Sequence, residues 1–571
     1  MSVSRWRLVS IFVLGLMVTA YVLAGLLGIQ AHVNPVEMDT TDYLKTAYQI
    51  RTTGGILNHV QNCLSGVYRE GTQHPLYLLL ISPFAEKNIQ FFVHAKMASG
   101  VIGLFLLLVY FFSVRHLFGA AVAWISACFL ITSATFINLS TMVACESLLA
   151  LFFILFWLFA AKGFKNQKYW PLAGLFAGAA FLTKSIAIMT MPIFFLTVLL
   201  FSQERKRIFS SRLFWAFFAV FFLTASPLLI RNVKVYGTPF YSDSTAVMWI
   251  DRWHDFFRPD FKENPPTLFS YVRTHPPAQI GSIFLTGLFG RNPKMIADGL
   301  KPFAFWESKI NLRPLQGFHE KSVSWEAPWA WFLVLLCLAG LWKSRKQPAA
   351  QIALASMAVL LPFVGWFSKV FPGSPPTRLL YPLFFFIYIF GAVILCRWGD
   401  AVILRIKSPW TGRWPLAVAA IFTVVYLASM GAHVDWRSID PRKSYGYTSP
   451  FVEQLFWMKG NLRQGDVLMA GTVFTNYLFY FENQLNGQVI AIPRVETIDQ
   501  LVDYARGKSV RYGIMDLATV AYNLKPYRNY FDVGPSVGLR STAELPEPFK
   551  LIFSDPRQPS IYKIYELSRA R

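Results

Sequence analysis

Long apolar stretches recur along most of this chain of 571 residues. A run of about 17 to 25 apolar residues is long enough to cross a bilayer as an α-helix, the one single-segment structure that satisfies its own backbone hydrogen bonds there. By this length criterion the chain contains about eleven spans. We expect them at 8–29, 91–113, 120–138, 147–161, 169–183, 185–202, 213–230, 327–342, 350–368, 379–396 and 414–432. The pattern predicts a polytopic α-helical membrane protein.

The composition narrows the class further. Hydrophobic residues make up 54% of the chain and charged residues only 15%, whereas soluble domains carry about 25% charged residues. Disordered, collagen-like and coiled-coil chains are excluded by the same composition. A formal net charge of +23 can indicate nucleic-acid binding. The positions of the basic residues in the chain decide whether it does so here.

Basic residues are concentrated in the loops that would face the cytoplasm. If the N-terminus is cytoplasmic, short loops on that side should be rich in Lys and Arg, and the acids in them are only Glu204 and Asp400. The basic residues are Arg5, Arg7, Arg115, Lys162, Lys165, Lys168, Arg205, Lys206, Arg207, Arg212, Lys343, Arg345, Lys346, Arg397, Arg405, Lys407 and Arg413. The charge is therefore a topological signal, and we do not expect nucleic acid as a partner.

The first span follows Arg5 and Arg7, a pattern that also occurs in signal peptides. Its apolar core is long and no clear cleavage site precedes Gln30, so we expect it to stay as a membrane anchor. An odd number of spans then places the C-terminal region outside the cytoplasm.

Two domains are expected. The transmembrane domain covers 1–432 and carries the extracytoplasmic loops 30–90 and 231–326, and an extracytoplasmic α/β domain covers 433–571. In the first loop, HPLYLLLISPF is too short to span and is typical of a re-entrant or interfacial segment. In the second, AQIGSIFLTGLF is an amphipathic stretch that would lie along the membrane surface.

The C-terminal region alternates strands and helices. We expect an open, partly parallel sheet because short apolar runs are separated by turns and by two helical segments. The expected strands lie near 466–471, 488–492, 510–515, 549–554 and 560–566, and the helices near 450–462 and 496–507.

The five cysteines fit no disulfide scaffold. Only Cys63 lies clearly in a loop, which leaves Cys63–Cys145 as the one conceivable bridge. No zinc-type spacing, phosphate loop or G-x-G-x-x-G motif is present.

Ionisable residues near the outer ends of spans are the candidate site residues, because a charge in or beside hydrocarbon is costly. They are Asp39, Asp42, Lys96, Glu146, Lys184, Arg231, Lys369 and Arg378. All except Lys96 would gather at one extracytoplasmic level. Carboxylates facing several cations there suit a reaction on a membrane-bound phosphate, which the cations hold while a carboxylate binds a metal or accepts a proton.

Each candidate also has a structural interpretation. Asp39 and Asp42 could be solvated or cap the following helix, and Glu146 could cap its own helix. Lys184 and Arg378 could extend to lipid headgroups. This snorkelling is the favoured interpretation for three further cations, and His74 is more often a structural turn residue than a ligand. The three cations are Lys96, Arg231 and Lys369.

The order of several motifs resembles the GT-C membrane glycosyltransferases, in particular the aminoarabinose transferases of lipid A and the protein O-mannosyltransferases. The motifs are DTTDYLKTA (39–47), HPLY (74–77), STMVACESLLALFF (140–153), GLFAGAAFLTKSIAIM (174–189), SPLLIRNVKVYGTPFYS (226–242) and PPTRLLYPL (375–383). They follow the family order over most of the chain, and the C-terminal region resembles the periplasmic domain of many members.

The resemblance implies transfer of a sugar from a polyprenyl-phosphate donor to a lipid, glycan or protein acceptor, with inversion. Asp39 matches the aspartate that orients or deprotonates the acceptor, and Glu146 matches an acid that binds a metal or supports this base. Lys184 and Arg378 match cations that hold the donor phosphate. His74 and Tyr77, in HPLY, match a substrate-binding segment.

One position departs from the family pattern. Thr40 stands where the family has Glu after the leading Asp, which puts metal binding in doubt, and Asp42 could compensate one helical step away. A divalent metal ion is therefore an open question, and no other cofactor is expected.

Three other functions remain open. A transporter or lipid flippase would show charges near the bilayer midplane and two matching halves, and neither is evident. A non-catalytic scaffold of GT-C type is allowed by Thr40. A ligase that moves lipid-linked glycans would share the chemistry of the proposed transferase. The expected location is the bacterial inner membrane, with the site and the C-terminal domain in the periplasm.

Overall fold

The computed structural model describes most of the chain. The described residues are 3–36, 39–251, 265–301, 326–370, 377–405, 413–434, 436–446, 449–471, 478–481, 485–493, 495, 497–516, 532–533, 539–540, 547–554 and 562–567. Parts of the expected outer loop 231–326 and of the expected domain 433–571 lie outside these residues.

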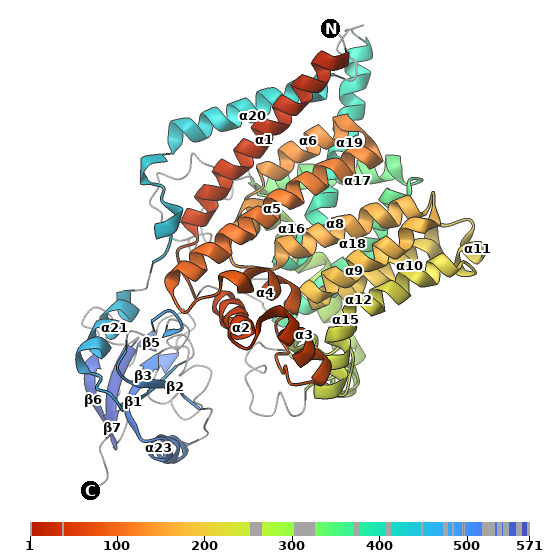
Figure 1. The fold of residues 1–571 in the computed structure, drawn as a ribbon. Coiled ribbons are helices and arrows are strands. Elements are labelled where there is room, and N and C mark those ends of the chain that lie inside the picture. The colour runs from red at the N-terminus through yellow and green to blue at the C-terminus, as the bar shows by residue number, and fades with distance from the viewer. Residues whose placement is uncertain are drawn as a thin grey trace.

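A bundle of apolar helices forms most of the protein (Figure 1). Among the described residues, seven helices are long and apolar enough to cross a membrane. They are α1 (Val3–Ala31), α5 (Ile89–Phe118), α8 (Glu146–Gly163), α12 (Arg212–Tyr236), α18 (Pro348–Phe367), α19 (Tyr381–Arg405) and α20 (Trp414–His433). The protein is therefore a membrane protein, as the sequence predicts.

The other four expected spans are also helical but are not among these seven. They are α6 (Ala120–Ile131), α9 (Trp170–Thr183), α10 (Thr190–Phe201) with the preceding η3 (Ser185–Met189), and α17 (Glu326–Ser344). The expected span 120–138 is interrupted after α6. Ser133 caps a separate helix, α7 (Ala134–Thr141), by accepting a hydrogen bond from the backbone N–H of Phe136.

Helix α19 forms the centre of the bundle. It is buried on all sides from Tyr381 to Ile394 and contacts α6, α8 and α17. A helix that is apolar all round is suited to such a position. Helix α1 contacts α5, α7 and α20, so the N-terminal span is an integral part of the bundle.

Several short helices lie between the spans in the chain. They comprise α2 (Thr40–Thr52), α3 (Gly55–Ser65), α4 (Pro75–Ile81), α14 (Leu268–Thr274), α15 (Pro277–Leu285), η6 (Thr286–Arg291) and α16 (Asn292–Gly299). In Figure 1, α2, α3 and α4 lie away from the N-terminus, and the C-terminal sheet lies beyond the same end. The HPLY segment forms α4, and α15 with η6 exposes Phe284, Leu285 and Phe289.

The C-terminal region is a small α/β unit. Its five-stranded sheet has the order β2-β1-β3-β7-β6, with β2, β1 and β3 parallel and β7 antiparallel to both neighbours. The elements are β1 (Val467–Ala470), β2 (Gln488–Ala491), β3 (Val510–Asp516), β6 (Phe549–Ser554), β7 (Tyr562–Leu567), α21 (Ser449–Asn461) and α23 (Ile498–Gly507). The expected partly parallel sheet is confirmed. An unpredicted pair, β4 (Asp532–Val533) and β5 (Leu539–Arg540), forms a second, two-stranded sheet.

The two faces of this sheet are covered by different helices. Met469 faces the core around Leu501 of α23, whereas its neighbour Leu468 faces the core around Met458 of α21. Successive side chains of a strand point to opposite faces, so both faces of β1 must be apolar. The apolar run VLMA in β1 therefore requires a helix on each side.

The conceivable disulfide between Cys63 and Cys145 is wrong. All five cysteines are free and buried. Cys145 precedes α8 and its Sγ accepts a hydrogen bond of 3.1 Å from the Tyr43 hydroxyl, so the thiol links α2 to the start of α8.

Close helix packing gives a testable prediction. A Cβ on Gly174 of α9 would lie 2.2 Å from the carbonyl oxygen of Phe217 in α12, so an alanine there must push the two helices apart. Membrane helices pack closely through such small residues. We expect Gly174→Ala to lower the free energy of unfolding by about 1 to 3 kcal/mol, the usual cost of overpacking. The measurement is thermal unfolding of the purified protein in detergent. Gly431→Ala is the control, because nothing lies within 4 Å of its added Cβ, and equal unfolding temperatures for both variants would contradict the prediction.

Candidate functional site

Four charged side chains from distant parts of the chain form a continuous series of ion pairs. The Lys184 Nζ lies 2.6 Å from Glu146 Oε1, which lies 3.7 Å from the Arg378 guanidinium. The same guanidinium nitrogen of Arg378 lies 2.9 Å from Asp39 Oδ2. Two carboxylates and two cations therefore meet at one place, at the end of the bundle that carries α2.

The start of α8 and the end of α9 position the first pair. The two helices pack against each other and are joined by the short connection 164–169, so the first turn of α8 and the last turn of α9 lie at the same end. Glu146 is in the first turn of α8 and Lys184 is the C-cap of α9. Each charge therefore has the sign that its helix dipole favours.

Asp39 and Arg378 form the second pair. Asp39 occupies the N-cap position of α2, but its side chain makes no capping hydrogen bond and turns to Arg378 instead. Arg378 lies in η9 (Thr377–Leu380), directly before the buried helix α19. A cation at the N-terminal end of a helix is disfavoured by the dipole, and two carboxylates offset this cost. The side chain of Asp39 therefore does not cap α2. The guanidinium of Arg378 pairs with carboxylates and does not extend to lipid headgroups.

The four side chains of the series differ in exposure. The Glu146 side chain is 1% exposed, those of Lys184 and Arg378 are 20% and 26%, and that of Asp39 is 38%. A ligand can therefore reach Asp39 and the cations while Glu146 stays buried behind them. The second carboxylate oxygen of Glu146, Oε2, has no hydrogen-bond partner among the described residues.

Asp42 lies one turn after Asp39 and is exposed. Partial desolvation of the carboxyl by the surrounding protein raises its pKa above the ordinary value. The charge of Lys45 opposes this shift, and the charges of Asp39 and Glu70 add to it. Asp42 therefore lies beside the ion-pair series without joining it.

His74 and Tyr77 are both buried. The His74 Nδ1 donates a hydrogen bond to the Phe181 carbonyl oxygen near the end of α9. Burial lowers the pKa of His74 to about 4 despite this bond, so the ring is neutral at pH 7. The Tyr77 hydroxyl bonds to Ser99 at 2.8 Å inside the protein. The structure places His74 against the helix that ends at Lys184 and does not bring Tyr77 to the ion pairs.

The expected snorkelling of three other cations is wrong. Lys96 is fully buried and its Nζ donates to backbone carbonyl groups of Ile29, His32 and Ser444. Arg231 is 1% exposed and donates to the Glu70 carbonyl oxygen. Each cation found oxygen acceptors inside the protein, so it did not need to reach the lipid headgroups.

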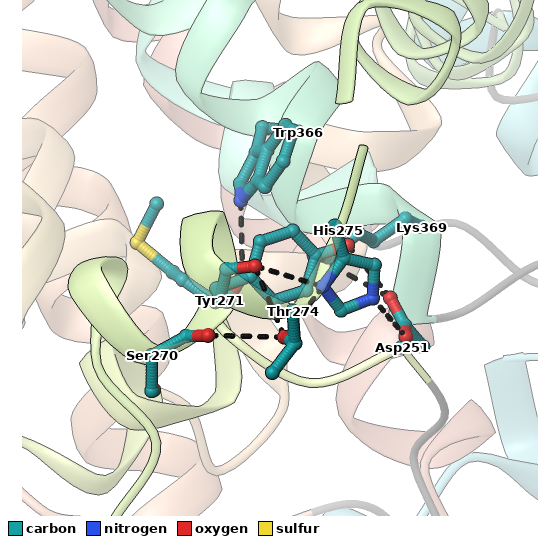
Figure 2. A network of polar contacts seen from close by, with 8 residues as sticks. Asp251, Ser270, Tyr271, Thr274, His275, Trp366 and Lys369 are labelled. Carbon is teal, nitrogen blue, oxygen red and sulfur yellow. Dashed lines mark hydrogen bonds and ion pairs between the residues drawn. The ribbon is translucent and has the colours of Figure 1, made fainter. Parts of the chain in front are cut away.

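Lys369 is the third of these cations and belongs to a separate network, shown in Figure 2. Its Nζ lies 3.7 Å from the ring centroid of Tyr271, 4.1 Å from that of Trp366 and 3.9 Å from Asp251 Oδ1. Asp251 accepts hydrogen bonds from the Tyr271 hydroxyl at 2.7 Å and from His275 Nε2 at 2.9 Å. The network joins α14 to the end of α18. No spacing in the sequence indicated it, because its residues come from three unrelated stretches.

This network gives a prediction of pH dependence. Partial burial alone would raise the pKa of Asp251, but hydrogen bonds from Tyr271 and His275 and the charge of Lys369 lower it below its ordinary value. The contribution of Asp251 to stability is therefore present above the ordinary carboxyl pKa of about 3.9 and is lost as the pH falls through the lower folded-state value. We expect Asp251→Asn to cost about 1 kcal/mol or less at pH 7, since the carboxylate is partly exposed.

The measurement is thermal unfolding of both proteins between pH 3 and pH 7. The difference in unfolding temperature should shrink toward pH 3, whereas Asp503→Asn on α23, an exposed carboxylate of the C-terminal unit, should show little difference at any pH. A difference that grows on acidification would contradict the prediction.

The carboxylates do not form a ready metal site. Among the described residues, no group of three or more His, Cys, Asp or Glu side chains is placed to hold a metal ion. The guanidinium of Arg378 lies between Asp39 and Glu146, and the buried Thr40 offers only a hydroxyl. This donor set does not fit a divalent cation, so the metal-binding alternative for Glu146 has no support in the geometry.

Comparison with known proteins identifies the fold. The sequence model of the family described as Dolichyl-phosphate-mannose-protein mannosyltransferase matches residues 84–230, which include Glu146 and Lys184. The structure is similar to ArnT from Cupriavidus metallidurans bound to undecaprenyl phosphate, with a TM-score of 0.55, 12% identity and coverage of 99% of this chain and 98% of that chain. The apo state of the same ArnT gives a TM-score of 0.54 at 12% identity, and the match covers 97% of this chain and 97% of that chain.

A more distant similarity is to the archaeal oligosaccharyltransferase AglB from Archaeoglobus fulgidus in complex with an inhibitory peptide and a dolichol-phosphate. Its TM-score is 0.50 at 14% identity, and the match covers 94% of this chain and 75% of that chain. No curated protein sequence matches this chain. The fold predicted from the motifs, that of the GT-C membrane glycosyltransferases, is thereby confirmed.

Proposed function

We propose that this chain, which has the GT-C fold, is a glycosyltransferase that moves a sugar from a polyprenyl-phosphate donor to an acceptor at the extracytoplasmic face of the membrane. The observation that carries the proposal is the series Asp39–Arg378–Glu146–Lys184, which combines an accessible carboxylate with two cations at one end of an apolar bundle. A relative of the same fold, ArnT, is described as bound to undecaprenyl phosphate.

The two cations would hold the donor phosphate. Arg378 and Lys184 are both partly exposed, and a guanidinium has five N–H donors, of which Asp39 uses one in this structure. The series is neutral overall, so an incoming phosphate anion competes with the carboxylates for these cations. In the proposed mechanism the donor phosphate displaces Asp39 from Arg378. Donor binding thus frees the Asp39 carboxylate to accept a proton from the acceptor.

Asp39 would act as the general base. The acceptor hydroxyl attacks the anomeric carbon from the side opposite the phosphate, and its proton passes to Asp39. The bond between the anomeric carbon and the phosphate oxygen breaks, and polyprenyl phosphate leaves with the extra negative charge. Placement of the nucleophile in line and neutralisation of the leaving group are the contributions that such a reaction needs.

Glu146 would hold the two cations in place. Its Oε1 contacts both Lys184 and Arg378, and its side chain is nearly inaccessible. A buried carboxylate between two cations fixes their separation, since each long side chain would otherwise be mobile. Its role is therefore to arrange the phosphate-binding groups and to set their combined charge.

The arrangement also supports a topology. We propose that residues 1–432 form the transmembrane domain and that 433–571 form an extracytoplasmic domain, with the site on the same side. Helices α2, α3 and α4 and the C-terminal sheet lie away from the N-terminus (Figure 1). The basic loops support a cytoplasmic N-terminus, and the bacterial inner membrane is the proposed location, with the site facing the periplasm.

The test is a transfer reaction with the purified full-length chain. The protein in detergent is incubated with radiolabelled polyprenyl-phosphate sugars and a membrane extract, and the products are separated by size and by solvent partition. Label in a new lipid, glycan or protein species supports the proposal and identifies the acceptor class. No transfer from any polyprenyl-phosphate sugar, by a protein that is folded by its thermal unfolding profile, would contradict it.

A further inference from the structure

We infer that Tyr480, in the C-terminal α/β unit, is a positioning residue for Asp39, an inference that rests on the proposed function of Asp39. The C-terminal unit and the residues before it reach back to the segment that joins α1 to α2. Three separate contacts hold this segment, and the last of them, at Pro35, lies four residues before Asp39 in the chain. In this arrangement the sheet unit is a part of the site's framework and not an independent appendage.

The first contact is made by Lys96 of α5. Its Nζ lies 3.0 Å from the Ile29 carbonyl oxygen and 2.7 Å from that of His32, at the end of α1. It also lies 2.5 Å and 2.8 Å from the carbonyl and hydroxyl oxygens of Ser444. One buried ammonium group thereby fastens the C-terminal region to the end of α1, and this is a reason for a charge in an apolar helix.

The second and third contacts lie further along the same segment. The backbone N–H of Gly446 donates to the Val33 carbonyl oxygen at 2.7 Å. The Tyr480 hydroxyl donates to the Pro35 carbonyl oxygen at 2.7 Å. The hydrogen bonds of Lys96, Gly446 and Tyr480 thus follow each other along the chain toward Asp39.

Tyr480 is linked to the start of α2 through a shared hydrogen-bond acceptor. The Pro35 carbonyl oxygen also accepts a hydrogen bond of 3.2 Å from the hydroxyl of Thr41, in the first turn of α2. Phe479, beside Tyr480, packs edge-on against Tyr48 of α2 with ring centroids 5.9 Å apart. Tyr480 is 2% exposed, so its ring is fixed by packing and its hydroxyl has a defined position.

Tyr480 would affect the position of the Asp39 carboxylate and not the binding of the donor. Asp39 is 38% exposed and, among the described residues, forms an ion pair with Arg378, a contact that donor phosphate would break. When that pair opens, the backbone before and after Asp39 must keep the carboxylate in place. A misplacement of about 1 Å can cost about a hundredfold in rate. Tyr480 supplies part of that backbone constraint from outside the transmembrane domain.

The experiment compares wild type with Tyr480→Phe, which keeps the ring and removes the hydroxyl. We expect kcat for transfer to fall about tenfold or more, since the freed backbone misplaces Asp39. The KM for the donor should stay within about twofold, because Lys184 and Arg378 are untouched. Amide hydrogen exchange in the first turn of α2 should become faster. Tyr504→Phe on α23 is the control and should change none of these quantities.

The outcomes separate this inference from the proposed function. A wild-type protein without transfer activity would contradict the proposed function, whereas unchanged kcat in Tyr480→Phe beside an active wild type would overturn the positioning role. Unchanged hydrogen exchange in the first turn of α2 would overturn it even without a transfer assay. A fall in unfolding temperature that accounts for the loss of activity would also overturn it, because the hydroxyl would then serve stability alone.

Discussion

Asp39→Asn is expected to lower kcat for transfer by about 10²- to 10⁴-fold, the range that a general base contributes. The amide has nearly the same shape as the carboxylate but cannot accept the acceptor's proton. The substitution should leave the protein folded, because Asp39 is partly exposed and Arg378 keeps Glu146 as a partner. The KM for the donor should change less than kcat, since the cations that hold the phosphate remain.

The measurement is initial transfer velocity at varied donor concentration, with thermal unfolding as the check on folding. Asp466→Asn is a matched control, because Asp466 is also a carboxylate paired with an arginine, Arg511, but in the sheet unit. Full transfer activity in Asp39→Asn would contradict the role of base. A cell that lacks the protein and is restored by Asp39→Asn would instead favour the non-catalytic scaffold.

Glu146→Gln is expected to have the largest effect on stability. The carboxylate is 1% exposed and lies against two cations, so its loss leaves Lys184 without its counter-charge beside Arg378, which keeps only Asp39 as a partner. Removal of one partner from a buried ion pair costs about 3 to 5 kcal/mol. Transfer activity should also be lost, because repulsion would separate the two groups that bind the donor phosphate.

A second substitution separates these two effects. In Glu146→Gln combined with Lys184→Met, one cation is removed together with the carboxylate, so most of the lost stability should return. Activity should not return, because Lys184 is one of the phosphate-binding groups. Thermal unfolding and transfer assays of wild type, both single variants and the double variant give the coupling between the two sites.

Glu204→Gln is the control for the stability measurement. Glu204 is paired with Arg207 on the surface, with 66% of its side chain exposed, and exposed pairs contribute about 0 to 1 kcal/mol. A Glu146→Gln protein as stable as this control would show that Glu146 is not the buried counter-charge that the structure places between the cations.

The helices and strands could be predicted because their signals are local. A run of apolar residues reports its own length, and every expected span is helical in the structure. The strands of the C-terminal sheet were found by short apolar runs between turns, such as that of β1 (Val467–Ala470). The sequence analysis did not predict the break between α6 and α7. Thr132 and Ser133 stand at this break, and single Thr or Ser residues also occur inside helices, so they are no clear signal of a helix end.

The charged residues show where local signals end. The cost of a charge beside hydrocarbon pointed to Lys96 and Lys369, but the sequence could not show which acceptors they would meet. Lys96 found carbonyl groups from the end of α1 and from Ser444, and Lys369 found two aromatic rings and Asp251. The prediction that both side chains extend to lipid headgroups was therefore wrong, because both are buried.

The sequence by itself determined the membrane class, the placement of the spans, the sheet of the C-terminal unit and the position of Glu146 and Lys184 at one level of the bundle. These follow from periodicity and from the antiparallel course of two adjacent helices. Only the tertiary structure brought Arg378 to Asp39, 339 positions apart in the chain, and Tyr480 to the segment before α2. Such contacts depend on how separate helices pack around α19, and packing is a property of the whole bundle that no single stretch of sequence contains.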